Sequence, residues 1–143
     1  MKSFLLAIVC AIVITGCEQA RTPCVYEVPE GFTGWVLIEY ENTNYPPLPK
    51  ESGKLIFKIG KDGRFFTSSK MQEGGAKDEY YYVGNSRTPI PETISGKGGL
   101  IWGEGNGMTQ KAGQKEIIYG EFFVGTEDQF NRLPKQEFLQ TVN

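Results

Sequence analysis

The chain has 143 residues with 15 basic and 17 acidic side chains, and it contains no histidine. This near-neutral balance provides no basic field for nucleic acid, so we expect no nucleic-acid partner. The lack of histidine excludes Ser-His-Asp and Cys-His catalysis, histidine-based zinc sites and the usual switch near neutral pH. We assign no catalytic residue, no metal ligand and no cofactor.

The N-terminal residues resemble the signal of a bacterial lipoprotein. Lys2 is followed by an apolar run over residues 4–14, and Ile14-Thr15-Gly16-Cys17 resembles a lipobox. As a helix the run spans only about 16 Å, too short for a hydrocarbon core of about 30 Å. The resemblance implies cleavage between Gly16 and Cys17 and a diacylglycerol on the Cys17 thiol. The alternative is an ordinary secretory signal with an incidental cysteine.

We therefore expect a signal peptide over residues 1–16, a lipidated N-terminus and tether over residues 17–24, and one β-rich domain over residues 25–143. Two or more acyl chains anchor a protein stably, which predicts a lipid-anchored extracytoplasmic protein whose first partner is the cell membrane. In a Gram-negative host, Glu18 after the lipidated cysteine resembles the pattern sorted to the outer membrane. Cys10 leaves with the signal and the Cys17 thiol carries the lipid, so Cys24 has no intrachain disulfide partner and is either incidental or paired with another chain.

The first half of the domain has strong β signals. Residues 34–40 are rich in β-branched and aromatic side chains, which predicts a strand with Val36, Ile38 and Tyr40 on one face. Three prolines over residues 46–49 exclude a ladder strand and predict a polyproline II crossover. Residues 54–59 and 64–67 flank Asp62-Gly63, which predicts a β-hairpin.

The second half adds strands over residues 79–83, 99–102 and 116–125, and Gly120 within the last suggests a bulge or bend. The glycine-rich segments 96–99 and 103–107 lack P-loop spacing and are predicted to be hairpin turns. Thr126 and Gln129 fit a capping box, which predicts a short helix to about residue 132. Phe138 and Leu139 are expected to form a second helical turn.

About seven short strands, frequent turns and little helix predict an all-β fold. We expect an antiparallel β-sandwich, immunoglobulin- or transthyretin-like, with a short C-terminal helix. A small barrel is the alternative.

The aromatic side chains carry the binding hypothesis. Aromatic residues make up 13% of the chain, and Trp35, Tyr81 and Trp102 are our candidates for ligand contact, although a role in the core is the competing interpretation. Four acids, Asp78, Glu79, Glu104 and Glu121, are the candidates for paired carboxylates. Residues 67–70 lack the serine that a Ser-x-x-Lys pair would need at position 67.

Four phrases resemble an uncharacterised family of small exported bacterial domains, which are often lipoproteins. They are Val28-Pro29-Glu30-Gly31-Phe32-Thr33-Gly34-Trp35, Pro46-Pro47-Leu48-Pro49, Ala76-Lys77-Asp78-Glu79-Tyr80-Tyr81-Tyr82-Val83 and Phe122-Phe123-Val124-Gly125-Thr126. The resemblance covers about residues 24–132 and implies one domain, but no activity. We expect a binding module for an envelope protein or polymer. The alternatives are a carboxylate-dependent hydrolase of cell-wall glycans and a structural envelope component.

Overall fold

The structure is a computed structural model that describes residues 20–110 and 112–135. The predicted signal peptide, its cleavage site at Gly16, the lipidation site at Cys17 and the second helical turn at residues 138–139 lie outside the described residues. The described strands and helix are β1 (Cys24–Pro29), β2 (Gly34–Tyr40), β3 (Lys50–Glu51), β4 (Lys54–Lys58), β5 (Arg64–Phe66), β6 (Glu79–Val83), β7 (Arg87–Pro89), β8 (Ile101–Thr109), β9 (Ile117–Val124) and α1 (Glu127–Arg132).

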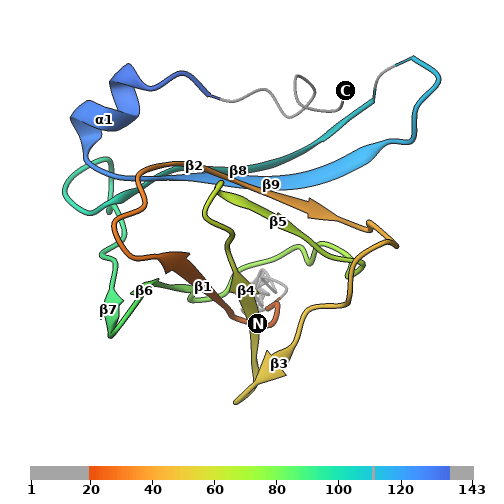
Figure 1. The fold of residues 1–143 in the computed structure, drawn as a ribbon, viewed down its shortest axis with the longest axis horizontal. Helices are drawn as coiled ribbons and strands as arrows, with labels where there is room; N and C mark the ends of the chain where they lie inside the picture. The colour runs from red at the N-terminus through yellow and green to blue at the C-terminus, as the bar shows by residue number, and fades with distance from the viewer. Residues whose placement is uncertain (1–19, 111, 136–143) are drawn as a thin grey trace, which may run out of the picture.

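The strands form two layers that face each other (Figure 1). A five-stranded sheet has the order β3-β4-β1-β6-β7, and a four-stranded sheet has the order β5-β2-β9-β8. The predicted all-β sandwich with a short C-terminal helix is therefore confirmed. The sheets are mixed rather than purely antiparallel, because β1 pairs in parallel with both β4 and β6, and β2 pairs in parallel with β5. The likeness to immunoglobulin or transthyretin sandwiches thus extends to the layers and not to the strand pairing.

The parallel pairs arise because the chain alternates between the layers. It passes from β1 to β2, then to β3 and β4, then to β5, then to β6 and β7, and each step changes sheet. The predicted hairpin between residues 54–59 and 64–67 is consequently wrong, although its turn exists. The Gly60 N–H donates to the Arg64 carbonyl, and Gly63 has a φ of 76° beside the Trp35 carbonyl. After this turn β5 joins the opposite sheet, and the Phe57 and Phe65 rings meet across the layers.

The core lies between the sheets and follows the period of two along each strand. Val36, Ile38 and Tyr40 of β2 share one face, as predicted, and this face points into the core, where Phe57 and Ile59 meet it from the other layer. Strand β1 was not among the predicted strands. It lies at the centre of its sheet and buries Cys24, Tyr26 and Val28. The proline segment at residues 46–49 connects the layers, with the Pro46 carbonyl accepting from the buried Thr67 hydroxyl at 3.0 Å.

The glycine-rich segment at residues 103–107 is part of β8 and not a hairpin turn as predicted. The bulge in this pair of strands lies between Trp102 and Gly105 of β8, where Gly103 has a φ of 58°. Gly120 of β9 keeps a regular register with β2. Its missing side chain instead makes room for the Tyr40 ring, since a Cβ there would lie 3.4 Å from that ring.

Helix α1 begins at the predicted capping box. The Thr126 side chain accepts from the Gln129 N–H, and the Gln129 side chain accepts from the Thr126 N–H. Figure 1 places the helix beside the four-stranded sheet, on the side away from the other layer. Within residues 20–110 and 112–135, no helix has the length and apolar character needed to cross a membrane.

Candidate functional site

A pocket of about 390 Å³ opens between the two sheets. Strands β1, β4 and β6 contribute one wall, β2, β8 and β9 the other, and the loop between β5 and β6 closes one side. Its size falls in the range of small-molecule sites. It is lined by Arg21, Cys24, Tyr26, Ile38, Tyr40, Leu48, Leu55, Phe57, Lys70, Met71, Gln72, Glu73, Gly74, Asp78, Tyr80, Glu104, Gly105, Asn106, Gly120, Glu121 and Phe122.

The inner part of this pocket is aromatic, and we call Tyr26, Tyr40, Phe57, Tyr80 and Phe122 the pocket floor. The Tyr26 ring stacks on Phe57 and on Tyr80, with centroids 4.8 and 4.9 Å apart. Burial is the main cause that raises the pKa of Tyr26, Tyr40 and Tyr80 above the ordinary value of 10.0. The floor therefore offers neutral rings with hydroxyl groups, which suit an apolar ligand that also forms hydrogen bonds.

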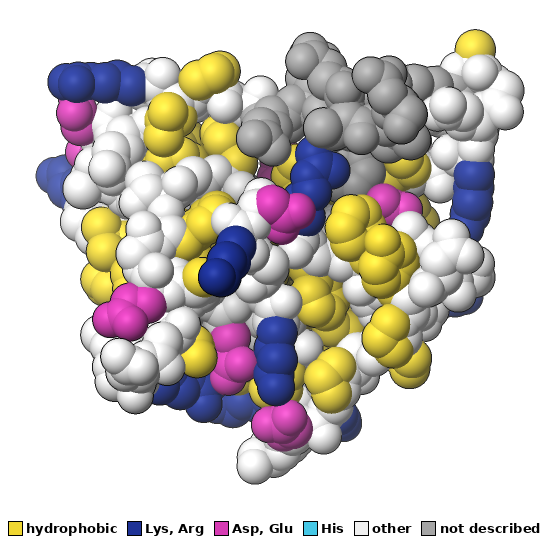
Figure 2. Space-filling model, in the orientation of Figure 1, with side chains coloured by type: hydrophobic (Ala, Val, Ile, Leu, Met, Phe, Trp, Pro, Cys, Tyr) yellow, Lys and Arg dark blue, Asp and Glu magenta, His cyan; other side chains and the backbone are white. Residues whose placement is uncertain are grey.

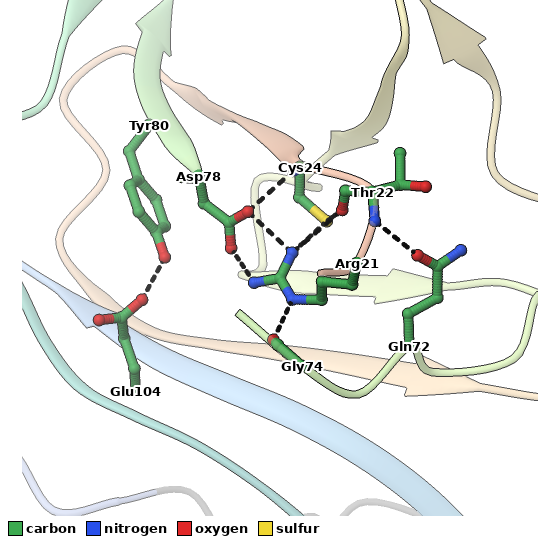
Figure 3. Close-up of polar contacts among 8 residues, drawn as sticks. All are labelled: Arg21, Thr22, Cys24, Gln72, Gly74, Asp78, Tyr80 and Glu104. Carbon is green, nitrogen blue, oxygen red and sulfur yellow. Dashed lines mark hydrogen bonds and ion pairs between the residues drawn. The ribbon is translucent and has the colours of Figure 1, made fainter. Parts of the chain in front are cut away.

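One wall of the pocket is fixed by an ion pair (Figure 3). The Arg21 guanidinium donates to both oxygens of the Asp78 carboxylate, at 2.9 and 2.5 Å. The Cys24 N–H donates to the same carboxylate at 2.9 Å. Side-chain exposure is only 18% for Arg21 and 11% for Asp78, so water screens this bidentate pair poorly. The contacts join the start of β1 to the start of β6.

The Cys24 thiol lies beside this ion pair in the pocket wall. Cys24 is 6% exposed, and it is a free cysteine. Burial raises the pKa of the thiol, the negative charge of Asp78 adds to the rise, and Arg21 opposes it. The thiol is therefore largely protonated at neutral pH and is a weak nucleophile.

A second polar contact spans the two layers. The Tyr80 hydroxyl of β6 donates to the Glu104 carboxylate of β8, and Figure 3 shows the two side chains pointing toward each other. Glu104 itself is exposed, so its carboxylate also reaches solvent. Nearby, burial raises the pKa of Glu92, with further contributions from the charges of Glu104 and Asp78. This edge of the pocket is therefore acidic.

The exposed residues that line the pocket lie in residues 104–106 of β8 and in the loop over residues 70–74, which we call the mouth loop. Lys70, Gln72 and Glu73 in this loop are exposed, whereas Met71 is half-buried. The charged and amide groups thus gather at the mouth, and the apolar side chains lie deeper. This gradient matches a site that takes a ligand with a polar end and an apolar end.

Two of the predicted contact aromatics do not lie in this pocket. Trp35 and Trp102 pack with Phe123 and Phe130 on the outer face of the four-stranded sheet, and we call these four residues the outer cluster. Phe130 of α1 lies 5.6 Å from Trp35 and 5.9 Å from Trp102, measured between ring centroids. The Trp102 indole N–H donates to the Gly125 carbonyl at 2.9 Å. These rings anchor the helix, and ligand contact by them stays a prediction.

The third predicted aromatic, Tyr81, lies on the outer face of the five-stranded sheet. Its hydroxyl donates to Glu79 at 2.9 Å, and the Arg87 guanidinium carbon lies 4.0 Å from its ring centroid. Lys54 also pairs with Glu79 there. Basic and acidic side chains are interspersed over the face that Figure 2 shows, with hydrophobic side chains visible between them.

The four candidate acids do not lie together in one site. Asp78 and Glu104 belong to the pocket described above, and Glu79 lies on an outer face. Glu121 also lines the pocket, but its side chain pairs with Lys135. Both oxygens of Asp78 already accept hydrogen bonds from Arg21, which leaves this carboxylate poorly suited to act as a nucleophile or a general base. Among the described residues, no group of three or more His, Cys, Asp or Glu side chains could hold a metal ion.

The sequence matches the profile of DUF6843, a family of unknown function, over residues 20–132. The chain belongs to this family. The match begins at the residue where the described structure begins and ends at the last residue of α1, so the DUF6843 domain is the whole sandwich with its helix.

A comparison with curated proteins gave no match. Among solved structures, the fold is similar to that of a protein from Bacillus anthracis that is provisionally described as a lipoprotein. The TM-score is 0.64 at 24% sequence identity, over 83% of this chain and 86% of the other. At this identity the similarity shows a shared fold only.

Sequence reasoning found part of the pocket. The sequence marks Asp78 and Glu104 as candidate acids and predicts a strand over residues 79–83, but it gives no signal for Arg21 or Gln72. Arg21 lies 57 residues from Asp78, and no local pattern marks such a pair. The alternation of Cys24, Tyr26 and Val28 was the available signal for the missing strand β1.

Proposed function

We propose that this protein is a lipoprotein of the cell envelope that binds a small ligand in the pocket between its two sheets. The pocket is the observation that carries the proposal, because it combines a volume of about 390 Å³, an aromatic floor and a polar mouth. The wider prediction of binding to an envelope protein or polymer is thereby narrowed to a ligand, or the end of a polymer, that fits this space.

The lipid anchor is the second part of the proposal. The lipobox at residues 14–17 supports it, and so does the provisional description of the Bacillus anthracis protein that shares the fold. Acyl chains on Cys17 would tie the domain to the outer side of the cell membrane, or to the outer membrane in a Gram-negative host. Replacing Cys17 by Ser tests the anchor: the processed protein should leave the membrane fraction, and retention there would contradict it.

Binding is favoured over hydrolysis by the state of the pocket acids. A glycosidase needs two carboxylates that are free to act on the substrate. Asp78 is tied to Arg21 and to the Cys24 N–H, and Glu104 accepts from Tyr80. These contacts fix the walls of the pocket, which is what a preformed binding site requires.

The pocket is tested with a pair of variants on one strand. Asn106 of β8 lines the pocket and is exposed, so a Trp side chain there should fill the cavity without disturbing the core. Thr109 lies three positions along the same strand and on its opposite face, so Thr109→Trp is the matched control. The processed lipoprotein would be isolated from its own membranes in mild detergent and weighed by native mass spectrometry.

We expect the wild type and Thr109→Trp to carry a bound molecule that Asn106→Trp has lost. A wild-type protein without any adduct would contradict the proposal. So would an adduct that all three proteins retain, since that molecule would be bound elsewhere.

A further inference from the structure

The segment that leads to the anchor is hydrogen-bonded to the mouth loop. Ala20 forms a parallel bridge with Gly75, and the Arg21 N–H donates to the Gly75 carbonyl at 3.2 Å. The Arg21 Nε donates to the Gly74 carbonyl at 3.0 Å, and the Thr22 N–H donates to the Gln72 side chain at 3.1 Å. The point where the chain enters the domain and the mouth of the pocket are therefore one place (Figure 3).

The remaining tether is short. Cys17 lies three residues before Ala20, and an extended chain covers at most about 3.5 Å per residue, or roughly 11 Å in total. Ala20 is already held next to the mouth loop by its bridge with Gly75. If acyl chains on Cys17 enter a bilayer, the mouth loop lies close to the lipid headgroups.

The polarity of the pocket matches this position. Lys70 in the mouth loop is exposed and forms no ion pair with any residue in the described part of the chain. A cation there suits the phosphate of a lipid headgroup. Inside the pocket, Leu48, Leu55 and Met71 are half-buried and offer an apolar surface to a hydrocarbon chain.

We infer that the mouth of the pocket faces the anchoring bilayer and that the ligand is a membrane lipid. Its apolar chain would lie in the pocket against Leu48 and Leu55, and its phosphate would lie at the mouth beside Lys70. This inference rests on the proposed function and gives that site a ligand class. A lipid in the same bilayer is also the ligand that the short tether presents at the highest local concentration.

The test uses the processed, lipid-anchored protein in vesicles of phosphatidylethanolamine and phosphatidylglycerol, with a trace of phospholipid that carries a diazirine on its acyl chain. After illumination, peptide mass spectrometry locates the crosslinks. We expect adducts on the pocket residues Leu48 and Leu55 in the wild type and in Thr109→Trp. Asn106→Trp should reduce them at least fivefold, and Met71→Trp at the mouth is a second blocking variant if the first does not fold.

Two further variants test the position and the charge of the mouth. About twenty flexible Gly and Ser residues inserted between Gln19 and Ala20 release the mouth from the bilayer surface, and the pocket crosslinks should fall several-fold. Lys70→Glu should lower them when phosphatidylglycerol is present, and should have less effect in vesicles of phosphatidylcholine alone.

The outcomes separate this inference from the proposed function. Pocket crosslinks that disappear in the blocking variants support both. A wild type without pocket crosslinks, but with a bound water-soluble molecule in native mass spectrometry, overturns the lipid inference and leaves the binding function in place. Absence of both signals overturns both. Crosslinks that the blocking variants retain place the lipid outside the pocket and also overturn the inference.

Discussion

The outer cluster and the pocket floor are both built from aromatic side chains, but their packing differs. In the outer cluster, Phe130 of α1 covers the sheet residues, and Phe123 beneath it is fully buried. In the pocket floor, Tyr26 and Phe57 stack closely, yet a space of about 390 Å³ remains above them. The outer cluster is made of Trp and Phe, whereas the pocket floor is rich in Tyr.

The difference shows that aromatic content alone does not locate a binding site. Trp35 and Trp102 are large and sit in a β-rich sequence, which made them natural candidates for ligand contact. Their partner Phe130 comes from a helix that packs against them. The pocket tyrosines are also buried, at 4–9% exposure, but a cavity adjoins them. Buried rings form part of a site only where a cavity lies beside them.

The largest loss of stability is expected when a ring of the outer cluster is removed. Phe123→Ala removes a ring that contacts both Trp35 and Phe130, so it should lower the free energy of unfolding by about 3–5 kcal/mol. Met71→Ala at the mouth should lower it by only about 1 kcal/mol, because this half-buried side chain already faces open space. Urea unfolding followed by Trp fluorescence measures both values.

The exposed Ile94 supplies the control for this comparison. It is 75% exposed, so Ile94→Ala should change the free energy of unfolding by less than about 0.5 kcal/mol. If Met71→Ala proved as destabilising as Phe123→Ala, the pocket would be as closely packed as the outer cluster, and the contrast between them would be lost.

Alkaline pH should act on the pocket floor and spare the outer cluster, which contains no tyrosine. Burial raises the pKa of Tyr26, Tyr40 and Tyr80, so these groups stay protonated in the folded state when they ionise in the unfolded state. Their stabilising contribution is complete below pH 10 and is lost as the pH rises above it. Each should lower the free energy of unfolding by about 1.4 kcal/mol per pH unit there.

Two measurements check this pH dependence. Absorbance at 295 nm should show tyrosines that ionise only as the protein unfolds. Tyr40→Phe should make the loss of stability above pH 10 less steep by up to about 1.4 kcal/mol per pH unit. A free titration of all tyrosines near pH 10 in the folded protein would mean that the pocket floor is open to water.

The pocket wall depends on charge where the outer cluster depends on packing. Asp78→Asn leaves an acceptor for the Cys24 N–H but removes the charge that holds Arg21, and should cost about 2 kcal/mol. Thermal and urea unfolding measure the loss. Arg21→Gln and the double variant complete a double-mutant cycle, and a coupling energy near zero would show that the two side chains do not act as a pair.

Features that depend on neighbouring residues could be predicted from the sequence. The capping box of Thr126 and Gln129, the shared face of Val36 and Ile38, and the turn at Gly63 all follow from local chemistry. They were predicted correctly because backbone conformation and side-chain period are set within a few residues.

The pairing of the strands could not be predicted in the same way. Residues 54–59 have one apolar face, and Phe65 of the second strand can meet it side by side in a hairpin or face to face across a sandwich. The contact of Phe57 with Phe65 shows the second arrangement. The same limit applies to the pocket, because Tyr80 and Glu104, or Arg21 and Asp78, meet only after the layers have formed.

The smallest expected effect is a change in the reactivity of the Cys24 thiol, which tests access to the pocket at one residue. It lies in the pocket wall with 6% exposure, and burial raises its pKa, so it should react with iodoacetamide roughly tenfold more slowly than an exposed thiol at pH 8. The rate should rise with pH as the thiolate forms. A bulky maleimide should react far more slowly than iodoacetamide, because only a small reagent enters through the mouth. Asn106→Trp should slow the reaction with iodoacetamide further, whereas Thr109→Trp should not. Equal rates for both reagents would mean that the thiol is reached by opening of the domain, and the pocket would then lack the defined mouth that distinguishes it from the outer cluster.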